Sequence, residues 1–185
     1  MTTLDAIQQA CTAWCYFDSP LGTMQLARTE HGLAGAWFEA QQHHPQRLSA
    51  RKTQVDTLLQ RATQQLSRYF NGEAVVFDLA LDLHGTPFQR SVWQALLRIE
   101  RSSTCCYGDI AAQIGAPSAA RAVGAAVGRN PVAIIVPCHR VLGSSGALTG
   151  YAAGLERKVA LLALERQPHR PARALQACLP FEAAA

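Results

Sequence analysis

The chain has 185 residues, of which 49% are hydrophobic, and this is enough for one folded domain or two small ones. No run approaches the roughly 18 to 20 apolar residues that span a bilayer, and residues 1–11 lack the pattern of a secretory signal, so we expect no membrane contact and a cytoplasmic location. The net charge of +4 is modest, and the six cysteines lack the spacing of a disulfide framework, which argues against a small secreted protein.

Residues 1–84 predict a small α/β domain built on an antiparallel sheet. Turn-forming residues such as Ser19-Pro20-Leu21-Gly22 separate its apolar segments. An apolar stripe at helical spacing predicts a helix from Leu58 to Phe70, and Val75–Phe77 is a further strand candidate. No chemical function follows from this half by itself. Three short strands are expected at Trp14–Phe17, Thr23–Arg28 and Gly32–Phe38.

Residues 85–167 predict a mainly α domain of the winged helix-turn-helix type, and residues 168–185 a loosely held tail. Thr86 and Pro87 are typical of a helix start. A break at Gly115-Ala116-Pro117 separates the two helices of the helix-turn-helix, and Ser118 is expected to cap the second. Helices are expected at Pro87–Ile99, Tyr107–Ile114, Ser118–Val127 and Leu155–Glu165, with the Gly- and Ser-rich Val141–Tyr151 as a hairpin or wing.

The outer face of the second helix carries small residues and one cation, at the spacing Arg121, Gly124, Ala125 and Gly128. A helix with its side chains is about 10–12 Å across, whereas the minor groove of DNA is about 6 Å wide. A face reduced to glycine and alanine therefore allows a close approach to DNA. Tight packing against another helix explains the same residues, and this face alone does not decide between the two.

Basic residues are concentrated in the C-terminal half. Residues 1–117 carry nine Lys/Arg and ten Asp/Glu, whereas residues 118–173 carry eight and two. Arginine accounts for 15 of the 17 basic residues, and its planar guanidinium group binds phosphate well. The pattern is compatible with a nucleic-acid partner, but an ordinary solvated surface accounts for it equally.

The segment Ile134–Arg140 is the strongest candidate for chemistry. Its β-branched residues predict a buried strand that Pro137 ends, because proline cannot donate a ladder hydrogen bond. Cys138 then has His139 beside it, and a nearby base or cation favours the nucleophilic thiolate. Adjacent side chains point apart in an extended chain, so either the chain turns sharply or a water carries the proton. A buried structural cysteine is an equally acceptable interpretation of these residues.

Several motifs occur in order between Gly85 and Glu165. Together they resemble the alkylguanine-DNA alkyltransferase family, which repairs O6-alkylated guanine. The block of proline, cysteine, histidine and arginine, preceded by Asn130-Pro131 and a helix-turn-helix, is highly specific for this family. The matching stretches are Gly85–Arg90, Val92-Trp93, Tyr107–Ala111, Arg121–Gly124, Asn130-Pro131, Ile135–Val141 and Gly150-Tyr151, with Lys158 and Leu161-Leu162.

The resemblance implies a catalytic set. Cys138 is the expected alkyl acceptor, His139 deprotonates it through a water, and Glu165 orients His139. Tyr107 helps to rotate the nucleotide and gives a proton to the departing guanine, while Asn130 braces the turn around Cys138. The product is a thioether, so each chain acts once. Neither a cofactor nor a metal is implied.

The resemblance also implies a partner: double-stranded DNA containing O6-alkylguanine, bound by a monomer largely without sequence preference. Guanine O6 lies inside the stacked duplex, so the nucleotide has to be flipped out, and Arg121 is expected to fill its place. The other implied DNA contacts are Tyr107, Ser118, Ala119, Gly124, Ala125, Gly128 and Arg129. The implied base pocket is formed by Pro137, Val141, Tyr151 and Ala152.

The sequence departs from the family pattern in one loop and at one residue of the pocket. Ile99-Glu100-Arg101-Ser102 replaces the common Ile-Pro-x-Gly, so this loop is expected to differ. Ala153 replaces a glycine, and its methyl group would narrow the pocket.

Some relatives bind zinc, but the candidate ligands lack a tight zinc spacing and we expect no zinc site. Those candidates are Cys11, Cys15, His31 and His43.

The residues are compatible with two rival functions. One is a winged helix-turn-helix protein that binds alkylated DNA without transferring anything, and Cys138 argues against it. The other is a cysteine hydrolase or redox enzyme that uses Cys138 and His139, for which nothing else in the sequence indicates a substrate. One turnover per chain would distinguish the repair protein from a hydrolase.

Overall fold

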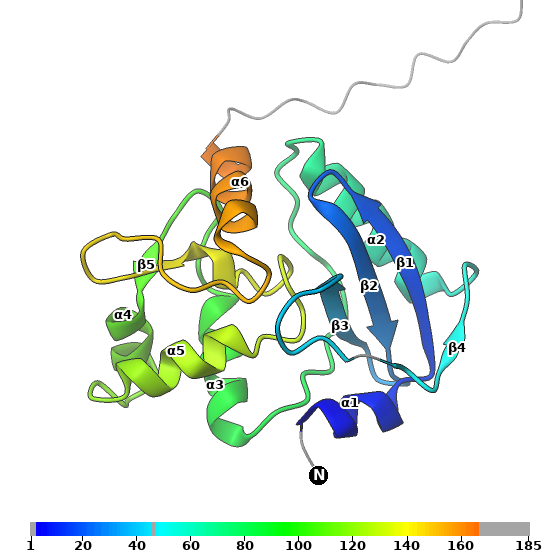
Figure 1. The fold of residues 1–185 in the computed structure, drawn as a ribbon, viewed down its shortest axis with the longest axis horizontal. Coiled ribbons are helices and arrows are strands. Elements are labelled where there is room, and N and C mark those ends of the chain that lie inside the picture. The colour runs from blue at the N-terminus through cyan, green and yellow to red at the C-terminus, as the bar shows by residue number, and fades with distance from the viewer. Residues whose placement is uncertain (1–2, 46, 167–185) are drawn as a thin grey trace, which may run out of the picture.

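The computed structural model describes residues 3–45 and 47–166, so the predicted tail lies outside the described residues. A four-stranded sheet in the order β3-β2-β1-β4 forms the N-terminal half, and helices dominate the C-terminal half (Figure 1). The helices are α1 (Thr3–Ala10), α2 (Thr57–Phe70), α3 (Pro87–Leu96), α4 (Tyr107–Gln113), α5 (Ala120–Gly128), the 3-10 helix η1 (Cys138–Arg140) and α6 (Leu155–Arg166). The strands are β1 (Ala13–Ser19), β2 (Gly22–Arg28), β3 (Leu33–Phe38), β4 (Arg51–Lys52), β5 (Cys105–Cys106) and β6 (Val141–Leu142).

The predicted three-stranded meander is confirmed. β1 and β2 pair antiparallel around a turn in which Ser19 Oγ donates to the Gly22 carbonyl oxygen over 2.6 Å, and β2 pairs antiparallel with β3. The short β4 lies parallel to β1, so the sheet is mixed rather than purely antiparallel. Gly22 closes the turn at a φ of +111°, a conformation that a residue with a side chain rarely adopts.

Helix α2 covers one face of this sheet. It begins at Asp56, whose carboxylate accepts a hydrogen bond from the Leu59 N–H over 3.0 Å. Its apolar stripe packs against the inward side chains of β1 and β2, as the sequence predicted. The opposite face of the sheet packs against α1 through Ile7 and Trp37. The buried residues of α2 are Leu59, Ala62, Gln65, Leu66 and Tyr69.

Helices α3, α4 and α5 pack together in the C-terminal half. The predicted start of α3 is confirmed, because Thr86 and Gln89 form a reciprocal capping box. Trp93 is fully buried, and its indole N–H donates to the Ala126 carbonyl oxygen of α5 over 2.9 Å. The prediction that Ser118 caps the second helix is wrong: α5 begins at Ala120, its N-cap is Ala119, and no side chain caps it.

Two strand predictions are wrong. Residues 75–77 form no strand, and Val76 is 89% exposed; the linker pairs with β3 only further along, where the Leu33 N–H donates to the Ala80 carbonyl oxygen. The apolar run before Pro137 is a buried turn, because Ile134 has a φ of 72° and the Val136 N–H donates to the Val132 carbonyl oxygen. An apolar run indicates burial but does not distinguish a strand from a compact turn.

This turn joins the two halves. The Ala36 N–H of β3 donates to the Pro131 carbonyl oxygen, and the Ala133 N–H donates back to Ala36, each over 2.9 Å. One hydrophobic core therefore runs from the sheet into the helices. After the turn, β6 pairs in parallel with β5, and the following loop is closed by a bond from the Gly143 N–H to the Ala147 carbonyl oxygen. Within the described residues, no helix is both long and apolar enough to cross a membrane.

Candidate active site

Cys138 begins the single turn of η1 and lies almost completely inside the protein, with 6% of its surface exposed. Its N–H donates to the Val136 carbonyl oxygen over 2.8 Å, and the Arg140 N–H donates to that of Pro137 over 3.0 Å. The chain thus turns sharply here. In a 3-10 helix successive side chains point about 120° apart, so Cys138 and His139 diverge even within this turn.

Asn130 holds both the turn and the thiol. Its amide nitrogen lies 3.0 Å from Cys138 Sγ and 2.8 Å from the Val136 carbonyl oxygen. Its amide oxygen accepts a hydrogen bond from the Val132 N–H over 3.0 Å. A single buried side chain therefore fixes the backbone before the cysteine and supplies a donor to the sulfur.

His139 and Glu165 form a buried pair, in which His139 Nε2 lies 2.9 Å from Glu165 Oε1. An ionised carboxylate only accepts hydrogen bonds, so Nε2 carries the proton. In the neutral ring the other nitrogen, Nδ1, then bears the lone pair. Nδ1 is buried and has no hydrogen-bond partner among the described residues. The ring is therefore held by α6 in the tautomer that a general base needs.

The expected pocket residues lie around this turn. Pro137 and Val141 are buried, while Tyr151 and Ala152 are partly exposed. Burial raises the pKa of the Tyr151 hydroxyl, and a thiolate at Cys138 would raise it further. The hydroxyl is buried and has no hydrogen-bond partner among the described residues. The Ala152 carbonyl oxygen accepts a hydrogen bond from the Gln42 N–H over 2.9 Å, which ties this wall to the sheet half.

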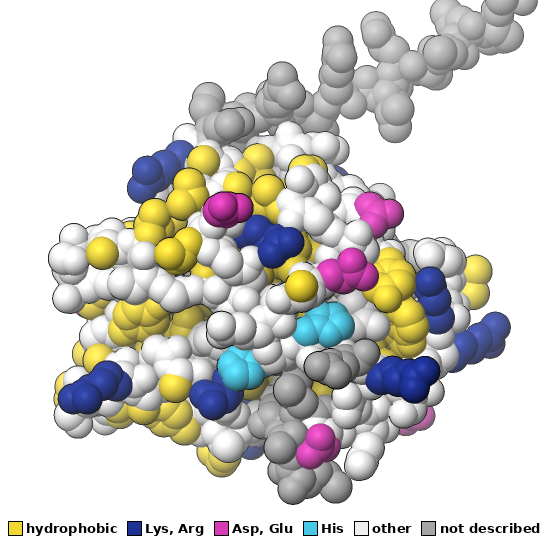
Figure 2. Space-filling model, viewed as in Figure 1, with side chains coloured by type: hydrophobic (Ala, Val, Ile, Leu, Met, Phe, Trp, Pro, Cys, Tyr) yellow, Lys and Arg dark blue, Asp and Glu magenta, His cyan; other side chains and the backbone are white. Residues whose placement is uncertain are grey.

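The expected DNA-binding residues of α5 lie on the face of the helix that is exposed to solvent. Arg121, Ala125 and Arg129 are exposed, and a Cβ placed on Gly124 would lie 3.8 Å from the Tyr107 ring. The Tyr107 hydroxyl donates to the Thr149 carbonyl oxygen over 3.3 Å. Ser118 is exposed, Ala119 and Gly128 are partly exposed, and Arg129 donates to the Ala125 carbonyl oxygen. On the face in Figure 2, Lys and Arg side chains are spread over both halves.

Two family models match the chain: "6-O-methylguanine DNA methyltransferase, ribonuclease-like domain" over residues 13–83, and the DNA binding domain of the same family over residues 87–167. The chain belongs to the 6-O-methylguanine DNA methyltransferase family. A methylated-DNA–protein-cysteine methyltransferase of Mycolicibacterium paratuberculosis is 52% identical over 155 residues, which cover 84% of this chain and 92% of the relative. One of Methanosarcina acetivorans is 46% identical over 154 residues, covering 82% and 97%.

Solved structures give the same result. The crystal structure of Mycobacterium tuberculosis OGT in complex with DNA has a TM-score of 0.79 and 48% identity, and the match covers 84% of this chain and 93% of that chain. The sequence-based prediction of the family is therefore confirmed. The similarity extends over both halves of the chain rather than over the helix-turn-helix alone.

The surroundings of Cys138 in this methyltransferase act on its charge in opposite directions. Burial raises the pKa of the thiol, whereas the Asn130 hydrogen bond and the positive charge of Lys158 lower it. Lys158 is itself buried, and its ammonium group donates to the carbonyl oxygens of Val141 and Thr149 over 2.6 and 2.8 Å. The net direction is upward, so the resting methyltransferase holds a neutral thiol.

The histidine and the glutamate differ in charge. Burial lowers the pKa of His139, and Glu165 offsets this only in part, so the ring is neutral at rest. Burial alone would raise the pKa of Glu165, but the hydrogen bonds and charges of His139 and Arg140 outweigh it and hold the pKa well below its ordinary value. The site therefore contains a neutral thiol, a neutral imidazole with a free lone pair, and a fixed carboxylate.

The sequence analysis missed several contributors to the methyltransferase site. Arg140 binds both carboxylate oxygens of Glu165, at 3.0 and 2.8 Å, and the Tyr69 hydroxyl donates to Oε1 over 2.8 Å. Lys158 was noted only as a matching position, and Tyr69 only as part of the apolar stripe of the helix predicted from Leu58 to Phe70. Their polar atoms reach the site from distant elements, and no local pattern in the sequence signals that.

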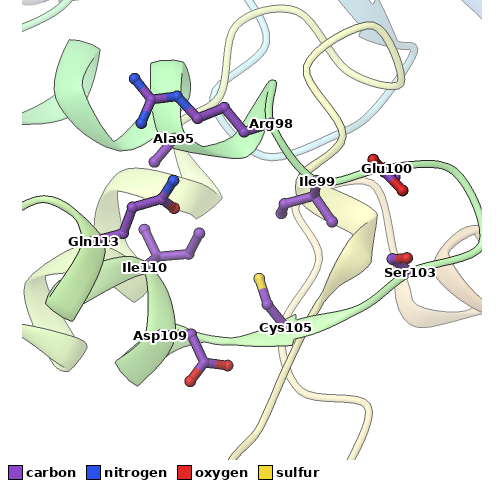
Figure 3. Close-up of a pocket in the computed structure, with 9 residues that line it drawn as sticks. All are labelled: Ala95, Arg98, Ile99, Glu100, Ser103, Cys105, Asp109, Ile110 and Gln113. Carbon is purple, nitrogen blue, oxygen red and sulfur yellow. The ribbon is translucent and has the colours of Figure 1, made fainter.

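In the part of the chain that the structure describes, no cluster of three or more His, Cys, Asp or Glu side chains could hold a metal ion. A surface hollow lies beside the site, between the end of α3 and the start of α4, and the sulfur of Cys105 points into it (Figure 3). It is lined by Ala95, Arg98, Ile99, Glu100, Ser103, Cys105, Asp109, Ile110 and Gln113, and Cys138 is not among them.

Proposed function

We propose that the chain repairs DNA by transferring the alkyl group of O6-alkylguanine to Sγ of its own Cys138. The observation that carries this proposal is the arrangement around the sulfur. A buried thiol receives a donor from Asn130 at 3.0 Å, and the neighbouring His139 is held by Glu165 in the tautomer of a base. Such an arrangement is typical of an activated cysteine nucleophile.

The transfer has two steps: the thiol of Cys138 loses its proton, and the thiolate then takes the alkyl carbon. His139 Nδ1 takes the thiol proton through a bridging water, because the two adjacent side chains diverge, and Glu165 stabilises the imidazolium that forms. The thiolate electron pair then forms a bond to the alkyl carbon as the bond from that carbon to guanine O6 breaks. Tyr107 gives a proton to the departing guanine. Neither water nor an ordinary base displaces the thiolate from the alkyl carbon of the thioether, so the chain acts once.

DNA enters from the side of α5. The target base is inside the duplex, so the nucleotide is flipped toward the pocket formed by Val141, Tyr151 and Ala152. The exposed Arg121 fills the vacated stack from the minor groove, and the small side chains beside it allow close approach. Binding of O6-alkylguanine DNA is largely independent of sequence and weakens with salt, because phosphate contacts dominate. The similar OGT of Mycobacterium tuberculosis has been crystallised with DNA.

A monomer is sufficient for this mechanism, because every proposed group comes from one chain. A cytoplasmic location also remains part of the proposal. It is supported by the cysteines of the described residues, Cys11, Cys15, Cys105, Cys106 and Cys138, which are all free thiols.

Mass spectrometry tests the transfer directly. The chain is incubated with a duplex that contains one O6-methylguanine and is then digested, and we expect one added methyl group on the peptide that contains Cys138. Cys138→Ser should prevent the addition, while Cys105→Ser should leave it unchanged. Unmodified protein that still binds the duplex would support the non-catalytic DNA binder, and many turnovers per chain would support a hydrolase.

The role of Arg121 has a separate test. Arg121→Ala should slow transfer from duplex DNA by about tenfold or more, because unstacking a base costs a few kcal/mol, but should leave reaction with the free alkylguanine base nearly unchanged. Arg61→Ala is a matched control, since Arg61 is an exposed arginine of α2 paired with Asp78. Equal slowing on both substrates would remove the stacking role.

A further inference from the structure

The sheet half reaches the active site through one hydroxyl group. Tyr69 lies near the end of α2, is 1% exposed, and donates to Glu165 Oε1 over 2.8 Å. The two residues are 96 positions apart in the chain. The oxygen that Tyr69 binds is the one that also receives the His139 N–H at 2.9 Å.

Among the described residues, the other side-chain partners of Glu165 come from a single element, η1. Arg140 binds both carboxylate oxygens and also donates to the Ile99 carbonyl oxygen over 2.5 Å. Arg140 and His139 both belong to η1, so they approach the carboxylate from one element. Tyr69 approaches it from a different element and provides an independent support. Burial and the Glu165 charge raise the pKa of Tyr69, so the phenol stays a neutral donor.

Tyr69 is itself held by the loop that departs from the family pattern. The Arg101 guanidinium lies over the Tyr69 ring, 5.5 Å from its centre, and donates to the carbonyl oxygens of Glu73 and Leu164 over 2.6 and 3.3 Å. Ser102 Oγ donates to the Glu165 backbone carbonyl over 2.6 Å. The ends of α2 and α6 are thereby tied to each other and to this loop.

We propose that Tyr69 is a positioning residue for the transfer reaction: its hydroxyl holds the Glu165 carboxylate so that Oε1 faces the His139 N–H. The proposal rests on the proposed roles of Cys138 and His139. It makes the sheet half part of the catalytic arrangement rather than only a support for the helices.

Removal of the hydroxyl has a predictable electrostatic effect. The Glu165 carboxylate is contacted by Tyr69, which belongs to α2, and by His139 and Arg140, which belong to η1. Two further cations lie nearby: Arg101 lies over the ring of Tyr69, and the charge of Lys158 in α6 acts on His139. Without the Tyr69 donor, more of the carboxylate charge acts on His139, which favours the imidazolium. In a plot of transfer rate against pH, the fall in rate on the acid side should therefore move to higher pH.

The test compares Tyr69→Phe with the wild-type chain. We expect the single-turnover rate at neutral pH to fall by about three- to tenfold, as for the loss of one hydrogen bond, with the acid limb shifted upward. Tyr16→Phe is the matched control, because Tyr16 is an exposed tyrosine of β1. In a His139→Phe background, Tyr69→Phe should have no further effect on the rate.

A second readout does not depend on DNA. The His139 ring is titrated by NMR in the wild-type chain and in Tyr69→Phe, and the midpoint should rise in the variant. If neither this midpoint nor the rate profile changes, the positioning role is wrong. Equal slowing by Tyr69→Phe with and without His139 would also overturn it, because the effect would then be structural. If the wild-type chain transfers no alkyl group but the midpoint still shifts, only the proposed function is lost.

Discussion

Cys138 and Cys105 lie in two regions whose charges and hydrogen-bond donors act differently on the pKa of a thiol. Burial raises the pKa of both thiols, and for Cys105 burial and the neighbouring charges together bring the pKa to about 11. Around Cys105 the negative charges of Asp109 and Cys106 act in the same direction as burial, whereas around Cys138 the Asn130 donor and the Lys158 cation act against it. Exposure alone would favour reaction at Cys105, so the surrounding donors and the adjacent base decide which sulfur is the nucleophile.

The largest expected effect comes from the carboxylate behind the base. Glu165→Gln removes the charge that stabilises the His139 imidazolium, and transfer to Cys138 should slow by about a hundredfold or more. It also leaves Arg140 without its counter-charge, so the free energy of unfolding should fall by about 3 kcal/mol. Single-turnover assays and urea unfolding measure the two. An unchanged transfer rate would show that Cys138 does not need the Glu165 charge behind His139. The difference in reactivity between Cys138 and Cys105 would then need another explanation.

The same carboxylate sets an acid limit on stability. The pKa of folded Glu165 is below its ordinary 4.5, so its contribution to stability is complete above that pH and is lost as the pH falls through and below it. Buried, neutral His139 adds a loss that begins below its ordinary pKa of 6.5. Urea midpoints measured below pH 4.5 should therefore fall less steeply in Glu165→Gln than in the wild-type chain.

Asn130 gives the next effect. Asn130→Asp keeps the oxygen that accepts the Val132 N–H but loses the donor to Cys138 Sγ and adds a negative charge. Because a hydrogen bond to a charged group contributes about 1.5 to 3 kcal/mol, transfer should slow by about 10- to 100-fold. Reaction of Cys105 with a small haloacetamide should not change. A transfer rate equal to that of the wild-type chain would mean that the thiolate does not depend on this donor.

Lys158 should have a smaller effect on the rate. Lys158→Met removes the buried cation, so the pKa of Cys138 should rise and its reaction with a haloacetamide at neutral pH should slow by about threefold. The carbonyl oxygens of Val141 and Thr149 lose the ammonium donor, and the free energy of unfolding should fall by about 2 kcal/mol. Labelling at Cys105 in the same sample is the internal control. Parallel slowing at both cysteines would indicate a general loosening of the structure.

The contrast between these regions also marks what the sequence could predict. Thr86, Pro87 and the β1–β2 turn have local signals, and the structure has the predicted elements there. The resemblance named Cys138, His139, Glu165, Asn130 and Tyr107 as one set. The structure brings the first four together, while the Tyr107 hydroxyl donates to the Thr149 carbonyl oxygen. That is an observation about their geometry, and their roles remain predictions.

Other features had no local signal. Ile134 adopts a positive φ within an apolar run that predicts a strand equally well. The hydrogen bonds that join Pro131 and Ala133 to Ala36 of β3 form only when the two halves are folded together. Tyr69 has the burial pattern of any core position on α2, and its hydroxyl becomes important only when α6 is folded beside it. Contacts between residues so far apart in the chain depend on the whole fold rather than on neighbouring residues.

The smallest expected effect concerns Cys105 itself. Cys105→Ser should change the rate of transfer by less than about twofold, because its sulfur points into the hollow beside α4 and only its backbone pairs with Val141 of β6 (Figure 3). The single-turnover assay with duplex DNA measures this, and a haloacetamide identifies the labelled peptide. A large loss of transfer would show that the hollow communicates with Cys138 through the β5–β6 pair. The two regions would then work as one, and the reactivity of Cys138 would no longer follow from its immediate neighbours alone.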